Sequence, residues 1–349
     1  VLSGLDGSVI NAGVERYKQL NSTHLEPVRN EATDHQTVCL LVETTQSRLR
    51  VSQAARTRVY SEDQRIEVER KLVEHPGWIG QELFIDVAKK KPVKIEKIVS
   101  LFTSRDFAIS EPALDAVEAV GQAGSFDELL QGHRLQWDHL WNRCDIRLEN
   151  SDRAQMILRL HIFHLLQAVS RNSIDLDVGV PARGWHGEAY RGHIFWDELF
   201  IFPSLNLRIP TLTRSLLLYR YRRLNRARLA AQSEGFSGAL YPWQSGSNGR
   251  EETQQLHLNP KSGRWLPDDS HLQRHVNHAI AYNVWQYYKA TGDREFLATY
   301  GAEMILEIAR FLAAITTFNP KLGRYEIMGV MGPDEYHHGY PDSKTPGLN

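Results

Sequence analysis

The sequence is poor in cysteine and methionine, with two and four residues among 349, and its formal net charge is only −1. Cys39 and Cys144 lie far apart and follow no metal-ligand spacing. They indicate no disulfide framework, and both are expected to be buried thiols. A net charge near zero removes the electrostatic case for binding nucleic acid or an anionic membrane. No apolar run reaches the roughly 18 residues that a membrane span needs.

What is present is ordinary globular composition, 42% hydrophobic and 24% charged. The start, VLSGLDGSVINAG, has no initiating methionine and no signal-peptide pattern, and the end, PDSKTPGLN, stops in a turn-like segment. We therefore expect a fragment of a longer protein. A cytoplasmic location is the default prediction.

Residues 1–110 have the pattern of antiparallel β-strands. Residues 38–44, VCLLVET, form a short apolar run rich in β-branched side chains. Further along, Val93, Ile95, Lys97, Val99 and Leu101 alternate with Lys94, Glu96 and Ile98. Strict period-two patterning between proline and glycine breaks predicts a β-sandwich.

Residues 111–150 change to a helical pattern and are expected to form a helical linker, with Ser125 as a possible N-cap. Residues 151–349 alternate long helices with long loops. Ser151 and Asp152 are good capping residues for a helix that is apolar on more than one side, as a helix buried between layers would be. Gly292 is expected to end another helix. Helical hairpins of this kind fit part of an α/α toroid, although a plain α-bundle is an alternative.

Two loops of the helical half combine aromatic, charged and amide side chains. They are PARGWHGEAYRGHIFWDELFIFP at 181–203 and GALYPWQSGSNGREETQ at 238–254. Five of the eight tryptophans lie between Trp185 and Trp285. A sugar ring has an apolar C–H face and a rim of hydroxyls, so flat aromatic faces beside carboxylates and amides suit a sugar site. The alternative is that these tryptophans close the ends of a helical barrel.

A third segment, MGVMGPDEYHHGYPD at 328–342, places Asp334 and Glu335 on a Gly-Pro turn. Cleavage of a glycosidic bond needs an acid that protonates the leaving oxygen. A carboxylic acid serves near pH 7 only when burial or a neighbouring negative charge raises its pKa, and Asp334 is such a neighbour for Glu335. Taken alone, the segment fits a solvated acidic turn equally well.

Two rival interpretations involve other ligands. His271, His275 and His278 have helical spacing but no cysteine beside them, and they also suit a helix start with polar contacts, so we predict no metal site. Residues 214–231, RSLLLYRYRRLNRARLAA, carry six arginines with leucines between them. An amphipathic helix with a snorkelling basic face explains them better than nucleic-acid binding does.

Four motifs, ARGWHGEAYRGHIFWDE, GALYPW, VWQYYKATGD and MGPDEYH, resemble glycoside hydrolase family 65, and the resemblance spans nearly the whole chain. That family contains inverting disaccharide phosphorylases and a few hydrolases, such as acid trehalase and kojibiose hydrolase. The resemblance implies that residues 1–110 are the C-terminal part of a β-sandwich domain. It implies that residues 111–150 are a helical linker and that 151–349 are the N-terminal part of an (α/α)6-barrel catalytic domain.

The resemblance also implies roles for individual residues. Glu335 matches the general acid, and Trp196 and Asp197 match residues that hold the glucosyl ring in the cleavage subsite. The residues expected to line the same site are Arg191, His193, Trp243, Gln244 and His337. Gln244 departs from the family pattern, in which an acid follows the tryptophan. The insertion at 250–277 is a second departure, which leaves the acceptor sugar open.

The resemblance therefore implies inverting cleavage of an α-linked glucosyl disaccharide, with phosphate as nucleophile, and we expect no metal or organic cofactor. The alternatives are a hydrolase that uses water and a non-catalytic carbohydrate-binding module. The segment that would distinguish phosphate from water lies downstream of MGPDEYH in the family and is absent from this chain. A homodimer is expected from the resemblance alone.

Overall fold

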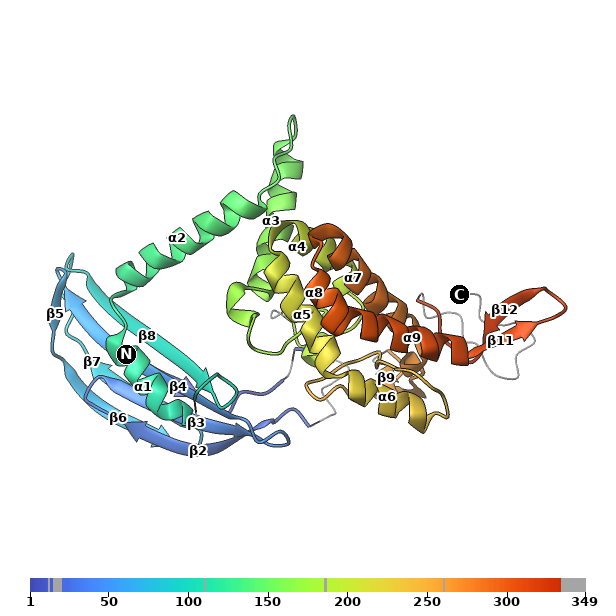
Figure 1. Ribbon diagram of the computed structural model, residues 1–349. Helices are drawn as coiled ribbons and strands as arrows, with labels where there is room; N and C mark the ends of the chain where they lie inside the picture. The colour runs from blue at the N-terminus through green and yellow to red at the C-terminus, as the bar shows by residue number, and fades with distance from the viewer. Residues whose placement is uncertain (12, 15–20, 110, 185–186, 260, 334–349) are drawn as a thin grey trace. The chain divides into compact units, whose positions relative to one another are not determined.

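The computed structural model describes residues 1–11, 13–14, 21–109, 111–184, 187–259 and 261–333. These residues form two compact units, which divide after Asn142, except that Gly13 and Val14 belong with the second unit (Figure 1). The division falls inside helix α2 (Phe126–Cys144), between the residue numbers 110 and 150 that were predicted as domain limits. Each unit is described separately below.

The first unit is a β-sandwich with one helix on its outer face. Its elements are β1 (Leu2–Asp6), β2 (Leu25–Ala32), β3 (Thr37–Thr44), β4 (Arg50–Ser61), β5 (Gln64–Ile66), β6 (Glu69–His75), β7 (Trp78–Phe84), β8 (Val93–Thr103) and α1 (Pro112–Gln122). One sheet has the order β2-β3-β4-β5 with β8 also paired to β4, and the other has the order β1-β7-β6. Every pairing between these strands is antiparallel, as predicted.

Apolar side chains fill both sides of the larger sheet. Leu5 and Ile79 from the smaller sheet pack on Val38, Leu40 and Val42 of β3. On the opposite face α1 covers Ala54, Ile98 and the thiol of Cys39. Both cysteines, Cys39 and Cys144, are free and buried, as expected.

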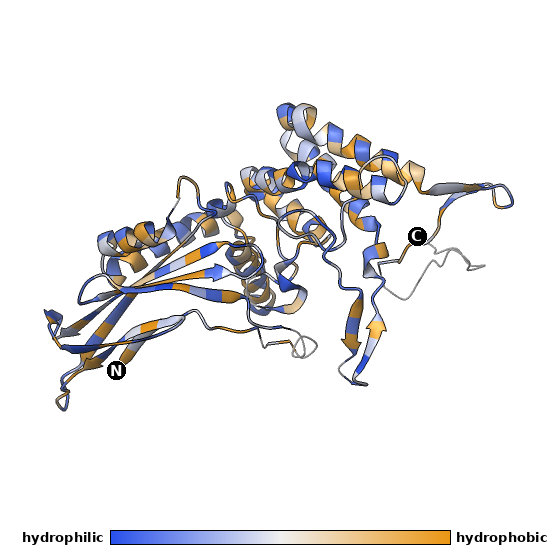
Figure 2. Cartoon of the chain, turned by 90° about the horizontal axis from the view of Figure 1, so that it is seen from below, coloured by the Kyte–Doolittle hydropathy of each residue, from blue (hydrophilic) through white to orange (hydrophobic). Residues whose placement is uncertain are grey.

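Strand β8 alternates as predicted, but its two faces are buried unequally. Glu96 and Ile98 are buried, whereas Val99 and Leu101 are 48% and 57% exposed. Helix α1 packs on the Ile98 side and covers it, and Figure 2 shows how blue and orange residues alternate along the strands. Alternation alone therefore identifies the strand but not the face that is covered.

The second unit is mostly helical. Its elements are α3 (Asp152–Ala168), α4 (Glu198–Arg208), α5 (Pro210–Arg222), α6 (Leu224–Ser233), α7 (His275–Thr291), α8 (Arg294–Phe296), α9 (Ala302–Ala314) and the hairpins β9-β10 (Leu256–Asn259, Arg264–Pro267) and β11-β12 (Thr316–Asn319, Arg324–Ile327). Helix α7 packs against α4, α5 and α9, so it is central to this unit (Figure 1). None of the described helices has the length and apolarity needed to cross a membrane.

The predicted helix ends are confirmed. Ser125 and Glu128 form a capping box, in which the Ser125 hydroxyl accepts from the Glu128 amide at 3.3 Å and the Glu128 carboxylate accepts from the Ser125 amide at 2.7 Å. Ser151 caps α3 by accepting from the amide of Ala154. Gly292 ends α7 in the left-handed conformation with φ of 68°.

One prediction about helix burial is wrong, and a second holds only in part. On α3, Met156 is 64% exposed and only Leu166 is buried, because few side chains among the described residues pack on its first turns. In the arginine-rich segment, Arg222 and Arg226 are exposed as predicted, but Arg220 and Arg223 do not snorkel to solvent. They are buried against the carboxylates of Glu198 and Asp177, which stand far away in sequence.

Candidate functional site

Two loops of the second unit pair directly, and most of the predicted site residues lie beside this pairing. Ile194 and Ser245 exchange two backbone hydrogen bonds of 3.0 Å in an antiparallel bridge. The bridge places the residues on either side of Ile194 next to the Trp243-Gln244 dipeptide. Ile194 and Ser245, 51 residues apart in the chain, thereby become neighbours.

The first loop is strained where it reaches the bridge. Tyr190 and Arg191 have φ values of 63° and 55°, and Gly192 follows with 71°. Non-glycine residues adopt this left-handed conformation at a cost in free energy, and such strain concentrates at functional sites. The turn directs the guanidinium of Arg191 toward Gln244.

Arg191, His193 and Gln244 form one hydrogen-bonded cluster. Arg191 Nη2 donates to Gln244 Oε1 at 3.4 Å and to the carbonyl oxygen of Glu252 at 3.0 Å. A guanidinium can only donate, so the oxygen of the Gln244 amide must face Arg191. The same oxygen lies 3.2 Å from His193 Nδ1, which must therefore carry the proton. The Gln244 Nε2 group is left as the donor that faces away from both.

The imidazole of His193 is neutral near pH 7. Burial lowers its pKa from the ordinary value, and the positive charge of Arg191 adds to the effect, although the hydrogen bond with Gln244 opposes it. The cluster thus offers hydrogen-bonding groups whose only full charge is that of Arg191.

Glu251 holds the Trp243-Gln244 dipeptide in place. Its two carboxylate oxygens accept from the backbone amides of Trp243 and Gln244 at 2.7 and 3.1 Å. Sequence reasoning placed Glu251 in the loop without giving it a role. The side chain of Glu251 closes the loop back onto Trp243. From the sequence alone, an acid at this spacing cannot be told apart from a solvent-exposed one.

Three aromatic rings meet beside this cluster. Trp196 and Trp243 lie with their ring centroids 6.3 Å apart, and His275 packs edge-on to both at 4.7 and 5.0 Å. Trp243 is 7% exposed, while Trp196 is half-buried. The two tryptophans that were predicted to bind a sugar therefore come from separate loops into one cluster.

Asp197 follows Trp196 and is half-buried. Burial raises the pKa of its carboxyl group above the ordinary value, and its own backbone amide partly offsets this. Among the described residues its carboxylate makes no hydrogen bond or ion pair with another side chain. It is thus available to accept hydrogen bonds from a ligand.

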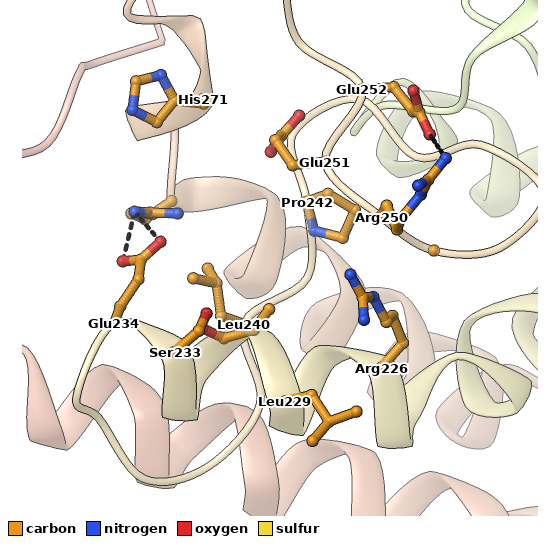
Figure 3. A pocket seen from close by; sticks show the side chains of 13 residues that line it. Arg226, Leu229, Ser233, Glu234, Leu240, Pro242, Arg250, Glu251, Glu252 and His271 are labelled. Atoms are coloured by element: carbon orange, nitrogen blue, oxygen red, sulfur yellow. Dashed lines mark hydrogen bonds and ion pairs between the residues drawn. The ribbon is translucent and has the colours of Figure 1, made fainter.

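A separate cavity of about 530 Å³ lies on the α6 side of the second loop (Figure 3). Arg274 Nη2 donates there to both carboxylate oxygens of Glu234 at 2.8 and 2.7 Å, and Arg250 lies 3.6 Å from Glu252. Of the predicted site residues that the structure describes, none lines this cavity. It adjoins the site through Glu251 and Glu252 but is distinct from it.

Glu335 and His337 lie outside the described residues. The segment that leads to them is described as far as Pro333, and the amide of Met331 donates to the carbonyl oxygen of Leu272 at 3.1 Å. This hydrogen bond attaches the segment before Asp334 and Glu335 to the turn that precedes α7. In the described part of the chain no group of three or more histidine, cysteine, aspartate or glutamate side chains is arranged to hold a metal ion.

Comparison with known proteins identifies two adjoining family domains. Residues 159–344 match the glycosyl hydrolase family 65 central catalytic domain, and residues 1–140 match its N-terminal domain. A solved structure from the human microbiome, described as a candidate kojibiose phosphorylase, superimposes with a TM-score of 0.77 at 22% identity, covering 97% of this chain and 42% of that one. The predicted order of a β-sandwich followed by part of a helical catalytic domain is confirmed.

The curated relatives are much longer than this chain. An uncharacterized glycosyl hydrolase of Mycobacterium tuberculosis is 46% identical over 99% of this chain, which spans 26% of that relative. The trehalose 6-phosphate phosphorylase of Lactococcus lactis is 35% identical, and this chain spans 42% of it. A kojibiose phosphorylase of Caldanaerobacter subterraneus is also 35% identical, with 44% of its length spanned. The chain belongs to glycosyl hydrolase family 65.

Proposed function

We propose that this chain contributes to inverting cleavage of an α-linked glucosyl disaccharide, with Glu335 as general acid and inorganic phosphate as nucleophile. The observation that carries the proposal is the gathering of Trp196, Trp243, Asp197 and the Gln244 cluster at one paired set of loops. Relatives named as trehalose 6-phosphate and kojibiose phosphorylases support it.

Each side chain suits one part of a glucosyl ring. The indole faces of Trp196 and Trp243 suit the apolar C–H face, since aromatic rings supply a large flat apolar surface. The carboxylate of Asp197 accepts from ring hydroxyls in charge-assisted hydrogen bonds. The free amide nitrogen of Gln244 donates to a hydroxyl oxygen, a role that the carboxylate of a glutamate does not have.

The proposed reaction is a single displacement. Glu335 donates its proton to the bridging oxygen while a phosphate oxygen attacks the anomeric carbon from the opposite face. The anomeric C–O bond breaks as the new C–O bond to phosphate forms, so an α-linkage yields β-glucose 1-phosphate. No protein nucleophile is required.

Hydrolysis is the second candidate, because the relative at 46% identity is named a glycosyl hydrolase. A hydrolase needs a base carboxylate about 6.5–9.5 Å from the acid, with a water molecule between them. The roles proposed for Trp196, Asp197 and Gln244 are the same in both reactions.

A homodimer remains a prediction.

One assay separates the two reactions. The full-length protein is incubated with maltose, trehalose, kojibiose, nigerose and trehalose 6-phosphate, each with and without inorganic phosphate, and the products are identified by NMR. We expect β-glucose 1-phosphate only when phosphate is present. Release of free sugar alone, at the same rate with and without phosphate, would replace the phosphorylase by a hydrolase.

Glu335→Gln tests the acid and the non-catalytic alternative together. The variant should lose turnover by about 100-fold or more while it still binds the sugar, because a general acid acts in the transition state. Glu74→Gln, at an exposed position on β6, is the matched control and should keep full activity. If the wild-type protein binds sugar but turns over none of the disaccharides, it is a binding module and not an enzyme.

A further inference from the structure

His275 is the one member of the aromatic cluster to which neither sequence reasoning nor the family resemblance gave a role in sugar binding. It is the first residue of α7, and its ring lies edge-on to Trp196 at 4.7 Å and to Trp243 at 5.0 Å. Residues on either side of His275 contact two segments of the site. Leu272, three residues before it, accepts from Met331, and the side chain of Asn277 accepts from the amide of Tyr241 at 2.8 Å.

Both ring nitrogens of His275 are shielded from solvent, and neither has a hydrogen-bond partner in the part of the chain that the structure describes. A neutral imidazole always carries one N–H donor and one acceptor lone pair. Leaving both groups buried and unpaired costs free energy, whereas a phenyl ring would make the same edge-on contacts without that cost. The nitrogens are therefore the feature of this side chain that packing does not explain.

The ring is neutral throughout the physiological pH range. Burial, with a smaller contribution from the charge of His278, lowers the pKa of His275 to about 4. A neutral ring can both donate and accept, so it complements a hydroxyl group, which does the same. An anion is a poorer match, because it is bound best by a positively charged donor. A metal ion is also a poorer match, because it needs further ligands nearby.

We propose that His275 is a further sugar-binding residue, which hydrogen-bonds a hydroxyl of the glucosyl unit that packs on Trp196 and Trp243. This inference rests on the proposed function, because it takes the ligand to be a glucosyl ring. Since solvent does not reach either nitrogen, binding requires a neighbouring side chain to move. Trp196 is half-buried and Trp243 is 7% exposed, so Trp196 is the ring with room to shift.

The test measures binding of glucose and its four monodeoxy derivatives (2-, 3-, 4- and 6-deoxyglucose) to the full-length protein by calorimetry. His275→Phe keeps an aromatic ring and removes both nitrogens. We expect it to weaken glucose binding by about 5- to 50-fold, and we expect one deoxy derivative to bind wild type and variant equally. That derivative lacks the hydroxyl that His275 bonds.

His278→Phe is the matched control, since His278 lies one turn further along α7 with an exposed side chain. It should bind every sugar as wild type does. Wild-type affinity for glucose in His275→Phe would overturn the inference, as would an equal loss for glucose and all four derivatives. If wild type itself does not bind glucose, the result contradicts the proposed function, and this inference, which rests on it, is contradicted as well.

A second measurement needs no variant to fold. Histidine-selective ¹⁵N NMR of wild type, with His275 assigned, should show its ring nitrogens shift on addition of glucose, together with a change in tryptophan fluorescence. Ring nitrogens of His275 that do not respond to saturating glucose would also overturn the inference.

Discussion

The carboxylate of Glu198 and the guanidinium of Arg220 meet at 3.1 Å with both side chains almost fully buried. Arg220 Nη2 also donates to the carbonyl oxygen of Phe195 at 2.7 Å, and the Arg220 carbonyl accepts from the hydroxyl of Tyr241 at 3.1 Å. Phe195 precedes Trp196, and Tyr241 lies two residues before the second tryptophan. The buried pair thus connects α5 to both loops that carry the aromatic site.

Breaking this pair should destabilise the second unit. Glu198→Gln leaves the charge of Arg220 buried without a counter-charge, so the free energy of unfolding in urea should fall by about 3–5 kcal/mol. The double variant Glu198→Leu with Arg220→Met removes both charges and should lose less. Glu62→Gln, which breaks the exposed pair with Lys91, is the control and should change little. Equal effects of the buried and the exposed change would contradict this account.

A glycine at the start of the second loop should be equally intolerant of change. Gly238 has φ of 89°, and a Cβ atom there would press on the backbone of Phe311 and Glu307 in α9. Gly238→Ala should therefore destabilise the protein by about 2–4 kcal/mol in thermal or urea unfolding.

Gly235 is the matched control for that substitution. It also has positive φ, at 83°, but no atom lies within 4 Å of an added Cβ. Gly235→Ala should cost only the backbone strain, about 1 kcal/mol. If the two alanine variants unfold at the same urea concentration, the close approach of the loop to α9 does not limit stability.

Local signals in the sequence predicted local structure well. Ser125, Ser151 and Gly292 each act through atoms within a few residues of themselves, and each forms the predicted cap. Arg220 and Arg223 were misjudged because their partners, Glu198 and Asp177, are 22 and 46 residues away. No periodicity within the arginine-rich segment carries information about those partners.

In the site, too, local features could be predicted from the sequence and long-range contacts could not. The bridge between Ile194 and Ser245 is a long-range contact, so residue patterns alone identified the two loops but not their meeting. The family resemblance supplied that step for Trp196 and Trp243. His275 was weighed as a metal ligand, since helical spacing to other histidines is visible in a sequence and packing between two tryptophans is not.

Replacing Gln244 by glutamate should change the charge of His193. In wild type, burial and the charge of Arg191 lower the pKa of His193. A carboxylate at position 244 would lie about where Gln244 Oε1 now lies, 3.2 Å from Nδ1, and would favour the protonated ring. NMR titration should show a higher pKa for His193 in Gln244→Glu than in wild type.

Gln255→Glu, an exposed change one residue beyond the same loop, is the control for that titration. It should leave the titration of His193 as in wild type. An unchanged pKa of His193 in Gln244→Glu would mean that the contact between the two side chains is not made in solution.

Replacing Asp197 by asparagine should raise stability at neutral pH while it weakens sugar binding. The native pKa of Asp197 lies above its ordinary value of 3.8 because burial opposes the charged form. The native state therefore holds this proton more tightly than the unfolded state. Its contribution to stability is full below pH 3.8 and is lost as the pH rises through the native pKa. At pH 7 wild type carries a half-buried charge that Asp197→Asn lacks.

We expect Asp197→Asn to melt at a higher temperature than wild type at pH 7 and at the same temperature at pH 3. Glucose affinity should fall by about 10- to 150-fold, since a charge-assisted hydrogen bond is lost. Asp86→Asn, at an exposed position in the first unit, should change neither property. A lower melting temperature for Asp197→Asn at pH 7 would show that the carboxylate is stabilised by a partner in the folded protein. It would then not be free to bind a sugar.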